Sequence, residues 1–336
     1  MNRVSQLTQA VRNPLAYLAE RWTPTSKTVQ RAALSSVVMI VVIVVTGGAV
    51  RLTSSGLGCP TWPSCTEESL TTTREMGLHG VIEFGNRLLT YAVSAAVGWT
   101  ILAARSAKPW RRSLTRLGWW QFWLVMGNAV LGGITVLTDL NPYTVASHFL
   151  LTTALLTVAL VTWQRTREGD AAPRPLVGLR IRRLVQAMVG VSAVLIAVGT
   201  VVTGAGPHPG DSSEVPRIPV DWEGISKFHA AFAWLLVLLA LALWAVMRAV
   251  DAPAGPRART RELLAILVAQ GAIGYVQYFT GMPEVLVAAH MLGSCLLWIA
   301  VLRLLLSLRE RPLPPASPTS TPTPGEASAP LPTPSA

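Results

Sequence analysis

Charge is scarce in this sequence of 336 residues. Only 13% of the residues are Asp, Glu, Lys or Arg, about half of the share that is usual in soluble domains. Hydrophobic residues make up 51%, and the mean hydropathy is +0.44. Cysteine is also rare, and three cysteines exclude a disulfide-rich scaffold. The composition therefore argues against a soluble protein and indicates a polytopic membrane protein.

The charge that is present is mostly positive, and the net charge is +11. Such a balance can indicate nucleic-acid binding, but here the basic residues form short clusters between long apolar runs, so we expect no nucleic-acid partner. Eight apolar runs are long enough to cross a lipid bilayer, which takes about 20 residues. These predicted spans lie roughly at 33–51, 79–104, 117–138, 142–164, 183–203, 227–249, 260–281 and 284–307.

The basic residues also predict the orientation. If the N-terminus is cytoplasmic, 23 of the 28 lysines and arginines fall in cytoplasmic segments, four fall outside, and Arg87 lies within a span. Positive charge accumulates on the cytoplasmic side of membrane proteins. We therefore expect a protein of the cell membrane with both termini in the cytoplasm. The first span has no A-x-A cleavage site close behind it, so we interpret it as a retained span and not as a signal peptide.

The chain repeats itself after four spans. GNAVLGGITVLTDLNPYTVASHFLL matches QGAIGYVQYFTGMPEVLVAAHML, and in both copies a glycine precedes a histidine by the same interval. Because four spans are an even number, both copies run the same way. The sequence thus predicts an all-α integral membrane protein of two tandem four-helix bundles, related by a pseudo-two-fold axis along the membrane normal. The expected parts are a cytoplasmic segment 1–32, an N-terminal bundle 33–164, a linker 165–182, a C-terminal bundle 183–308 and a disordered Pro/Ser/Thr-rich tail 309–336.

Three histidines are placed alike in the predicted spans. His148, His229 and His290 each follow the external start of a span by about five to seven residues, which is roughly 7–10 Å of helix. The equivalent residue of the second span is Asn86. Histidines inside membranes are rare and usually mark function, and two facing imidazoles are a natural axial pair for haem iron. Packing between helices is the alternative, and zinc is disfavoured because no further ligand accompanies the two histidines of the second half.

The other two histidines lie near the external surface. His208 is expected to be a solvated loop residue. His79 is on the face of Asn86 but about 10 Å nearer the surface, and we interpret it as an interfacial residue.

Glu83 is the only acidic residue away from the ends of a predicted span. A carboxylate in hydrocarbon costs at least ~2.5 kcal/mol, so it must be paired or functional. It shares a helix face with Asn86, and Arg87 four residues later can be its ion-pair partner. Both roles are compatible, because the pairing would keep the carboxylate ionised.

Other candidates lie at the external surface. Cys59 and Cys65 lie in the first external loop, where an oxidising compartment permits a disulfide, although free thiols or a metal pair are alternatives. Arg51 ends the first span and can either bind an anionic group such as a haem propionate or extend toward water. Cys295, within the last span, is expected to be a small buried apolar residue.

The motif TGGAVRLTSSGLGCPTWPSC, followed by IEFGNR, resembles the haem A synthase family, and the resemblance extends over all eight spans. Members of that family oxidise a methyl group of haem O to a formyl group for aa3-type terminal oxidases, by two hydroxylations and loss of water. The resemblance implies that His229 and His290 hold a haem b, that the N-terminal bundle binds the substrate haem through His148, and that Glu83 is the catalytic carboxylate. It further places Asn86, Arg51 and Arg87 at the haem sites. Cys59 and Cys65 match the paired cysteines of one branch, where they are linked to electron or haem transfer.

One residue departs from the family pattern. E-x-x-H-R often occurs in the second span of the family, whereas this chain has E-x-x-N-R with Asn86 in the histidine position. Asn is a poor iron ligand, so either His148 alone holds the substrate haem or His79 or water takes the other side. An inactive N-terminal half is the further alternative, against which the retained Glu83, Arg87 and cysteine pair argue.

The sequence therefore favours an enzyme that receives haem O, implied to come from a haem O synthase, and passes electrons to an unidentified acceptor. A membrane di-haem b-type electron-transfer cytochrome is the chief alternative, and a proton-relaying transporter is a third. The residues do not fix the oligomeric state, and a homo-oligomer is compatible with them.

Overall fold

The computed structural model describes residues 12–312. In that range a short helix, α2 (Pro14–Arg21), precedes eight long helices, and each long helix is apolar enough to cross a membrane. The long helices are α3 (Ser26–Leu52), α4 (Gly77–Ser106, entered through the 3-10 turn Arg74–Met76), α5 (Arg112–Leu137), α6 (Pro142–Arg165), α7 (Leu179–Ala205), α8 (Trp222–Ala249), α9 (Ala254–Phe279) and α10 (Glu284–Ser307). The prediction of an all-α, multi-pass membrane protein is confirmed.

Each predicted span lies on one of these helices, although the predicted ends at 138 and 281 extend one or two residues too far. Several helices begin before the apolar run because polar residues cap their first turns. Thr25 accepts a hydrogen bond from the backbone N–H of Thr28 at the start of α3, and Asp221 caps α8 in the same way. Such caps satisfy N–H groups that a helix leaves without partners.

Large apolar side chains cover the outside of the helices. Trp123 is 63% exposed, and Leu238 is 60% exposed. In water, apolar patches of this kind would promote aggregation, whereas lipid solvates them. The interior contains hydrogen-bonded polar pairs, such as Ser36 with Thr100 between α3 and α4. The pattern fits helices that are packed against each other on one side and against lipid on the other.

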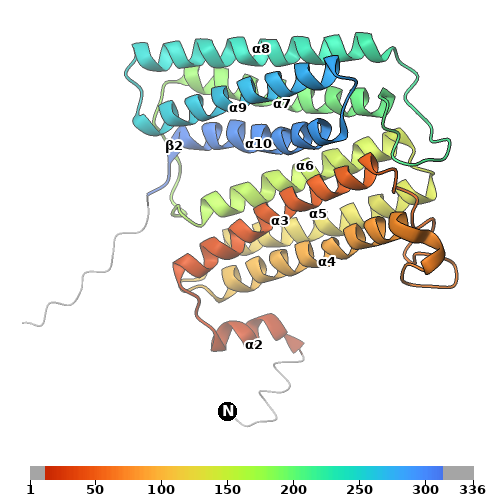
Figure 1. Ribbon diagram of the computed structural model, residues 1–336. Coiled ribbons are helices and arrows are strands. Elements are labelled where there is room, and N and C mark those ends of the chain that lie inside the picture. The colour runs from red at the N-terminus through yellow and green to blue at the C-terminus, as the bar shows by residue number, and fades with distance from the viewer. Residues whose placement is uncertain (1–11, 313–336) are drawn as a thin grey trace, which may run out of the picture.

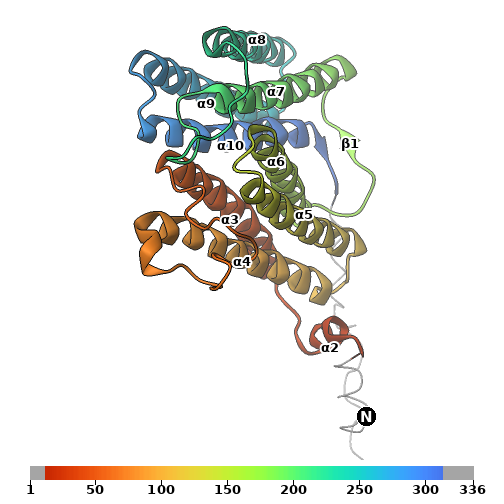
Figure 2. The same cartoon turned by 90° about the vertical axis from the view of Figure 1, so that its right-hand side faces the viewer.

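The long helices form two groups of four (Figure 1). In the N-group, α3 to α6 contact each other in a closed ring, and α7 to α10 form the equivalent ring of the C-group. The groups meet where α3 contacts α10 and where α6 contacts α7 and α10 (Figure 2). A two-fold axis that exchanges α3 with α7 and α6 with α10 would convert the first of these contacts into the second. The contacts are thus consistent with the predicted pseudo-two-fold relation, while the predicted domain boundaries stay predictions.

The loops gather at two ends of the molecule (Figure 1). We call one the disulfide end, because the loop with Cys59 and Cys65 lies there together with residues 206–221 and 280–283. At the opposite end, the linker end, lie residues 107–111, 166–178 and 250–253 and the two ends of the described chain. There, β1 (Arg174–Pro175) pairs antiparallel with β2 (Arg309–Glu310). The first residues of the predicted disordered tail are thus paired with the linker, and residues 1–11 and 313–336 lie outside the described range.

A cluster of ionic contacts centred on Asp170 joins the linker to the N-group. Its carboxylate accepts hydrogen bonds from Arg111 at 2.8 Å, from Arg165 at 2.5 Å and from the Ser113 hydroxyl at 2.8 Å. The hydrogen bond from Arg111 is the main reason why the pKa of Asp170 is lowered to about 2. The free carboxyl group of an unfolded chain titrates near about 3.9. The cluster therefore contributes stability above about pH 4 and loses that contribution as the pH falls through about 2.

We expect Asp170→Asn to lower the stability of the folded protein near neutral pH by about 1 kcal/mol or less, since the side chain is 46% exposed and solvent screens the pairs. Thermal unfolding in detergent from pH 7 to pH 2 measures the effect. The difference from the unaltered protein should shrink below pH 4 and vanish near pH 2. Glu214→Gln, in an exposed loop, is the matched control. A difference that is constant over this range would contradict the assignment.

Candidate functional site

His229 and His290 face each other inside the C-group. His229 lies seven residues after the start of α8, and His290 lies six residues after the start of α10, and both helices begin at the disulfide end. Their ring centroids are 6.4 Å apart with an angle of 65° between the ring planes. The Nδ1 atoms of both rings are buried; that of His290 has no hydrogen-bond partner, and His229 has only the backbone of Leu195 close by. A buried polar atom that lacks a partner costs free energy, so such a pair is typical of a site that a ligand completes.

The spacing of this pair fits two ligands of one metal ion. An imidazole nitrogen lies about 2 Å from a bound metal, and the ring centre lies roughly 1.2 Å further, so two opposed imidazoles have centroids about 6.4 Å apart. Bis-histidine ligation of haem iron requires this arrangement. The donor set of His229 and His290 therefore fits a haem.

A glycine lies against each of these imidazoles on the neighbouring helix. A Cβ atom added to Gly199 of α7 would be 3.2 Å from Cε1 of His229, and one added to Gly274 of α9 would be 3.4 Å from Cε1 of His290. A Cβ atom at Gly199 would be tighter than an ordinary contact, and one at Gly274 would already touch the ring, so neither position has room for a larger side chain while the ring stays where it is. The absence of a side chain at these two positions is therefore part of what sets the ring positions.

The N-group repeats this geometry with one change. His148, six residues after the start of α6, faces Gly132 of α5 at 3.2 Å by the same measure and also has an unpartnered Nδ1 atom. Asn86 of α4 faces Gly47 of α3 at 3.8 Å. Its carbonyl oxygen accepts a hydrogen bond from the Thr46 hydroxyl at 2.8 Å. Asn86 thus occupies the position that histidine occupies in the other three helix pairs, and the N-group has one imidazole where the C-group has two.

Glu83 lies one turn from Asn86 on α4 and is only 5% exposed. Arg87 donates two hydrogen bonds to its Oε1 atom, from Nε at 3.1 Å and from Nη2 at 2.6 Å. Its Oε2 atom accepts the backbone N–H of Cys59. The ion pair predicted from the four-residue spacing is therefore present, and it stabilises the buried charge.

Arg87 also holds the loop that the two cysteines close. Cys59 and Cys65 form a disulfide, as the sequence led us to expect. Arg87 donates hydrogen bonds to three carbonyl groups of this loop, those of Cys59 at 2.7 Å, Thr61 at 2.9 Å and Ser64 at 3.1 Å. Glu83 and Arg87 together therefore fasten the disulfide loop to α4, and we call these two residues the loop clamp.

The same loop reaches the neighbouring helix through Trp62. A Cβ atom added to Gly133 of α5 would be 2.5 Å from the Trp62 ring, so only glycine permits the indole to lie there. Gly133 directly follows Gly132, which faces His148. The disulfide loop thus spans from the buried carboxylate of α4 to the part of α5 that lies beside the lone imidazole.

The two histidines of the disulfide end contribute neither to the imidazole pair of the C-group nor to the lone imidazole of the N-group. His79 is exposed, and its Nδ1 atom is 3.0 Å from the hydroxyl of Ser55; its place at the membrane interface stays a prediction. His208 is half-buried in the loop after α7 and is hydrogen-bonded to the carbonyl of Met282 at 2.8 Å. It is thus a loop residue, as expected, but it is held by the loop between α9 and α10 and is not freely solvated.

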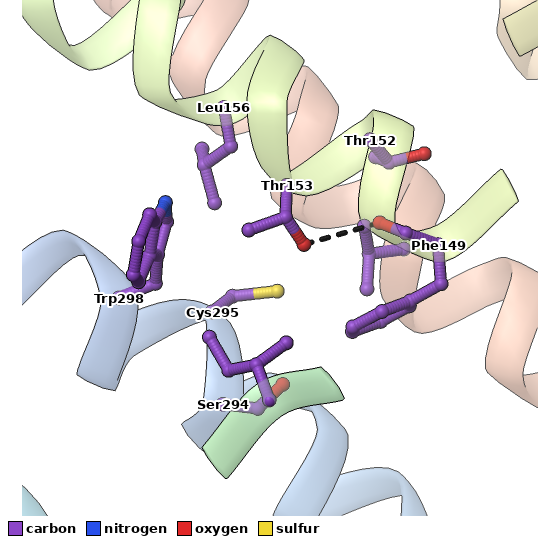
Figure 3. A pocket seen from close by; sticks show the side chains of 9 residues that line it. Phe149, Thr152, Thr153, Leu156, Ser294, Cys295 and Trp298 are labelled. Carbon is purple, nitrogen blue, oxygen red and sulfur yellow. Dashed lines mark hydrogen bonds between the residues drawn. The ribbon is translucent and has the colours of Figure 1, made fainter. Parts of the chain in front are cut away.

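Cys295 lies where the two groups meet. It is 5% exposed, with α6 side chains such as Phe149 and Thr153 on the facing side of a small apolar cavity (Figure 3). The hydroxyl of Thr153 donates to the carbonyl of Phe149 within its own helix. The expectation of a small buried apolar residue is confirmed.

Sequence reasoning missed several polar residues beside the imidazoles. The side-chain amide of Gln270 donates to the carbonyl of His290 at 3.0 Å. The corresponding residue of the first repeat, Asn128, accepts from the Thr152 hydroxyl at 2.8 Å. The sequence repeat aligns Asn128 with Gln270 and could have identified both residues, although only the fold reveals their hydrogen-bond partners.

Comparison with known proteins gives a consistent family. The family described as "Cytochrome oxidase assembly protein" matches residues 30–207, which is more than half of the chain. "Heme A synthase" of Geobacillus thermodenitrificans is 30% identical over 135 residues, covering 38% of this chain and 41% of that protein. "Heme A synthase" of Rhodopseudomonas palustris (strain HaA2) is 25% identical over 344 residues, covering 83% and 91%.

The chain thus spans about two fifths of the length of the Geobacillus relative, while the match to the Rhodopseudomonas protein covers most of both chains. The matched region of the family contains Glu83, Arg87, both loop cysteines and His148. These residues are the ones that the resemblance of the sequence motif had already singled out. The protein belongs to the cytochrome oxidase assembly protein family.

Proposed function

We propose that this protein is a haem A synthase, which oxidises a methyl group of haem O to a formyl group. The observation that carries the proposal is the asymmetry of the two helix groups. The C-group has two imidazoles at the spacing of an axial pair. The N-group has one imidazole, an asparagine and a buried carboxylate. An electron-transfer site and a substrate site would differ in this way.

In the C-group, His229 and His290 would hold a haem b. When bound, this group supplies one-electron chemistry, which lets electrons leave the substrate side one at a time. The protein's part is to keep the two rings opposed, to keep water away and to bind the carbonyl of His290 through Gln270. Among residues 12–312, no carboxylate is ion-paired with either of these imidazoles.

In the N-group, haem O would bind as the substrate through His148. Asn86 is held by Thr46 and is a poor iron ligand, so the face opposite His148 stays open to a small molecule. Asn86 and Arg87 would line this site. An iron with only one protein ligand suits a substrate that must be released after reaction.

Glu83 would accept a proton as the methyl group is oxidised. The conversion of a methyl to a formyl group passes through an alcohol and a geminal diol, removes four electrons from carbon, and ends with loss of water. A fixed carboxylate can take up the proton that leaves the carbon, or stabilise the positive charge that develops there. Arg87 would hold this carboxylate in place through two hydrogen bonds to its Oε1 atom.

The membrane orientation follows from the same features. We propose that the disulfide end faces the outside of the cell membrane, because a disulfide persists in an oxidising compartment. Both termini would then be cytoplasmic. The substrate would be supplied by a haem O synthase, since haem O is too apolar to travel freely through water.

A di-haem electron-transfer cytochrome is the alternative function. It would need a second pair of axial ligands, and the N-group offers one histidine beside Asn86. Co-expression with a source of haem O, followed by extraction of the pigments, distinguishes the two. Haem A in the extract supports the synthase. Haem b alone supports the cytochrome and contradicts our proposal.

The assignment of the C-group predicts which histidines hold haem b. We expect His229→Leu and His290→Leu each to abolish the low-spin haem b spectrum of the purified protein, because the remaining imidazole cannot form an axial pair. His148→Leu should keep that spectrum, and so should His208→Leu, which serves as a control in the loop. If His148→Leu removes the spectrum while the other two keep it, the two groups have been assigned the wrong way round.

A further inference from the structure

Arg51 of the N-group reaches into the C-group. It lies in the last turn of α3, and its Nη2 atom donates a hydrogen bond to the carbonyl of Thr203, in the last turn of α7, at 2.9 Å. A Cβ atom added to Gly210 would be 3.5 Å from Cγ of Arg51, so the loop after α7 covers the stem of the side chain. The side chain therefore lies against the end of α7, with its Nε atom buried, and does not extend freely into water, which was one of the two roles that the sequence left open.

A second guanidinium lies nearby. Arg217, in the loop between α7 and α8, donates to the carbonyl of Gly206 at 2.9 Å, just past the end of α7. Both guanidinium groups thus lie at the same end of α7, on carbonyls only three residues apart. The carbonyl end of a helix carries a partial negative charge, which offsets only part of two full positive charges.

Neither arginine has a carboxylate partner within residues 12–312 of the structure. The carboxylate of Asp211, which follows Gly210 in this loop, is already bonded to the backbone N–H groups of Leu57 and Ser213. The Nε atom of Arg51 is buried and has no hydrogen-bond partner. Two converging cations and one unused buried donor are the features of a site for an anion.

The location of Arg51 identifies the anion. On α7, Thr203 lies one turn, about 6 Å, beyond Gly199, which contacts the ring of His229. On α3, Arg51 lies three residues beyond Gly48, whose neighbour is Met291, the residue that follows His290. Counted along α7 and along α3 alike, the guanidinium of Arg51 lies about one helical turn from the imidazole pair, on the side of the disulfide end. A haem between the two imidazoles carries two carboxylates on one edge, several ångströms from its iron.

We infer that Arg51 and Arg217 bind the propionate carboxylates of the haem held by His229 and His290. The inference rests on the proposed function, because it needs a haem in the C-group. It adds that the cofactor site is completed by a residue of the other helix group. Two positive charges beside the haem disfavour the oxidised, more positive iron, and so they raise its reduction potential.

Redox titration of the haem b absorbance in the purified protein tests the inference. We expect Arg51→Gln and Arg217→Gln each to shift the midpoint potential to a lower value, and Arg51→Lys to restore part of the shift. Arg74→Gln removes an exposed charge at the same end of the molecule and should leave the potential unchanged. If Arg51→Gln does not fold, Arg51→Lys and Arg217→Gln decide the matter, since the latter lies in an exposed loop.

The outcomes separate this inference from the proposed function. Bound haem b with an unchanged potential in both Gln variants would overturn the inference and leave the synthase proposal intact. Lowered thermal stability with an unchanged potential would likewise overturn it, because the arginines would then only cap α7. An unchanged potential with loss of haem A formation would assign Arg51 to the substrate haem instead. Absence of haem b from the unaltered protein would overturn the proposed function itself.

Discussion

Glu83→Gln should yield a folded protein that keeps its haem b and forms little or no haem A, with unconverted haem O accumulating. Gln has the shape of Glu, but its one carbonyl oxygen can replace only one of the two carboxylate oxygens that accept from Cys59 and Arg87, and it has neither charge nor basicity. A positioned proton acceptor contributes about 10²- to 10⁴-fold to a rate. We therefore expect at least about a 100-fold decrease in haem A, measured by chromatography of extracted pigments after co-expression with a haem O source. Normal haem A formation by this variant would reduce Glu83 to a structural partner of Arg87.

The loop clamp makes a control necessary. Glu83 fastens the disulfide loop together with Arg87, so loss of activity in Glu83→Gln could follow from a loosened loop. Arg87→Gln removes three bonds to loop carbonyls and the ion pair to Glu83, but it keeps the carboxyl group of Glu83 and its bond to the N–H of Cys59. If the carboxylate itself is the proton acceptor, Glu83→Gln must be the more severe variant of the two. Equal losses would indicate that the clamp, and not proton transfer, is what the reaction needs.

The disulfide bond allows the state of the loop to be measured independently of enzyme activity. Alkylation of Cys59 and Cys65 at a fixed concentration of reductant reports how readily the bridge opens, and we expect Arg87→Gln to accelerate it. Glu83→Gln should accelerate it less, because the bonds from Arg87 to the loop carbonyls remain. If a variant loses activity while its rate of alkylation is unchanged, the loop is intact and the catalytic step itself has been impaired.

The sequence was sufficient to predict the features that repeat along single helices. Apolar runs of the right length gave the eight spans, and the four-residue spacing of Glu83 and Arg87 gave their ion pair. The shared interval between glycine and histidine placed His148 and His290 alike. These features depend on helical periodicity, which is local and can be read from the order of residues.

Contacts between distant segments were not predictable in this way. That Arg87 binds Cys59, Thr61 and Ser64 depends on the path of a loop with two prolines, which no periodicity describes. That Arg51 points toward Thr203 depends on how the two helix groups are packed. The glycines of the repeat were visible, but their position against the imidazole rings follows only from the packing of neighbouring helices.

Those glycines give a second prediction with a large effect. In Gly274→Leu the Cβ atom alone would already be in van der Waals contact with Cε1 of His290, at 3.4 Å, so the three carbon atoms beyond it should displace the ring. The 6.4 Å spacing of the two imidazoles would then be lost, and we expect Gly274→Leu to abolish haem b binding. Leucine is a good helix former, so α9 itself should persist.

The repeat supplies the matched variants that decide how this result is interpreted. Gly132→Leu should displace His148 in the same way, and we expect it to abolish haem A formation while the haem b spectrum stays unchanged. Gly271→Leu adds the same side chain one turn from Gly274, where no atom lies within 4 Å of an added Cβ. Both haem b binding and haem A formation should therefore be unaffected. Absorbance spectra of the purified variants measure haem b, and extracted pigments measure haem A. A normal haem b spectrum in Gly274→Leu would show that the spacing of the imidazoles does not depend on this glycine, and the argument that links ring position to haem binding would fail.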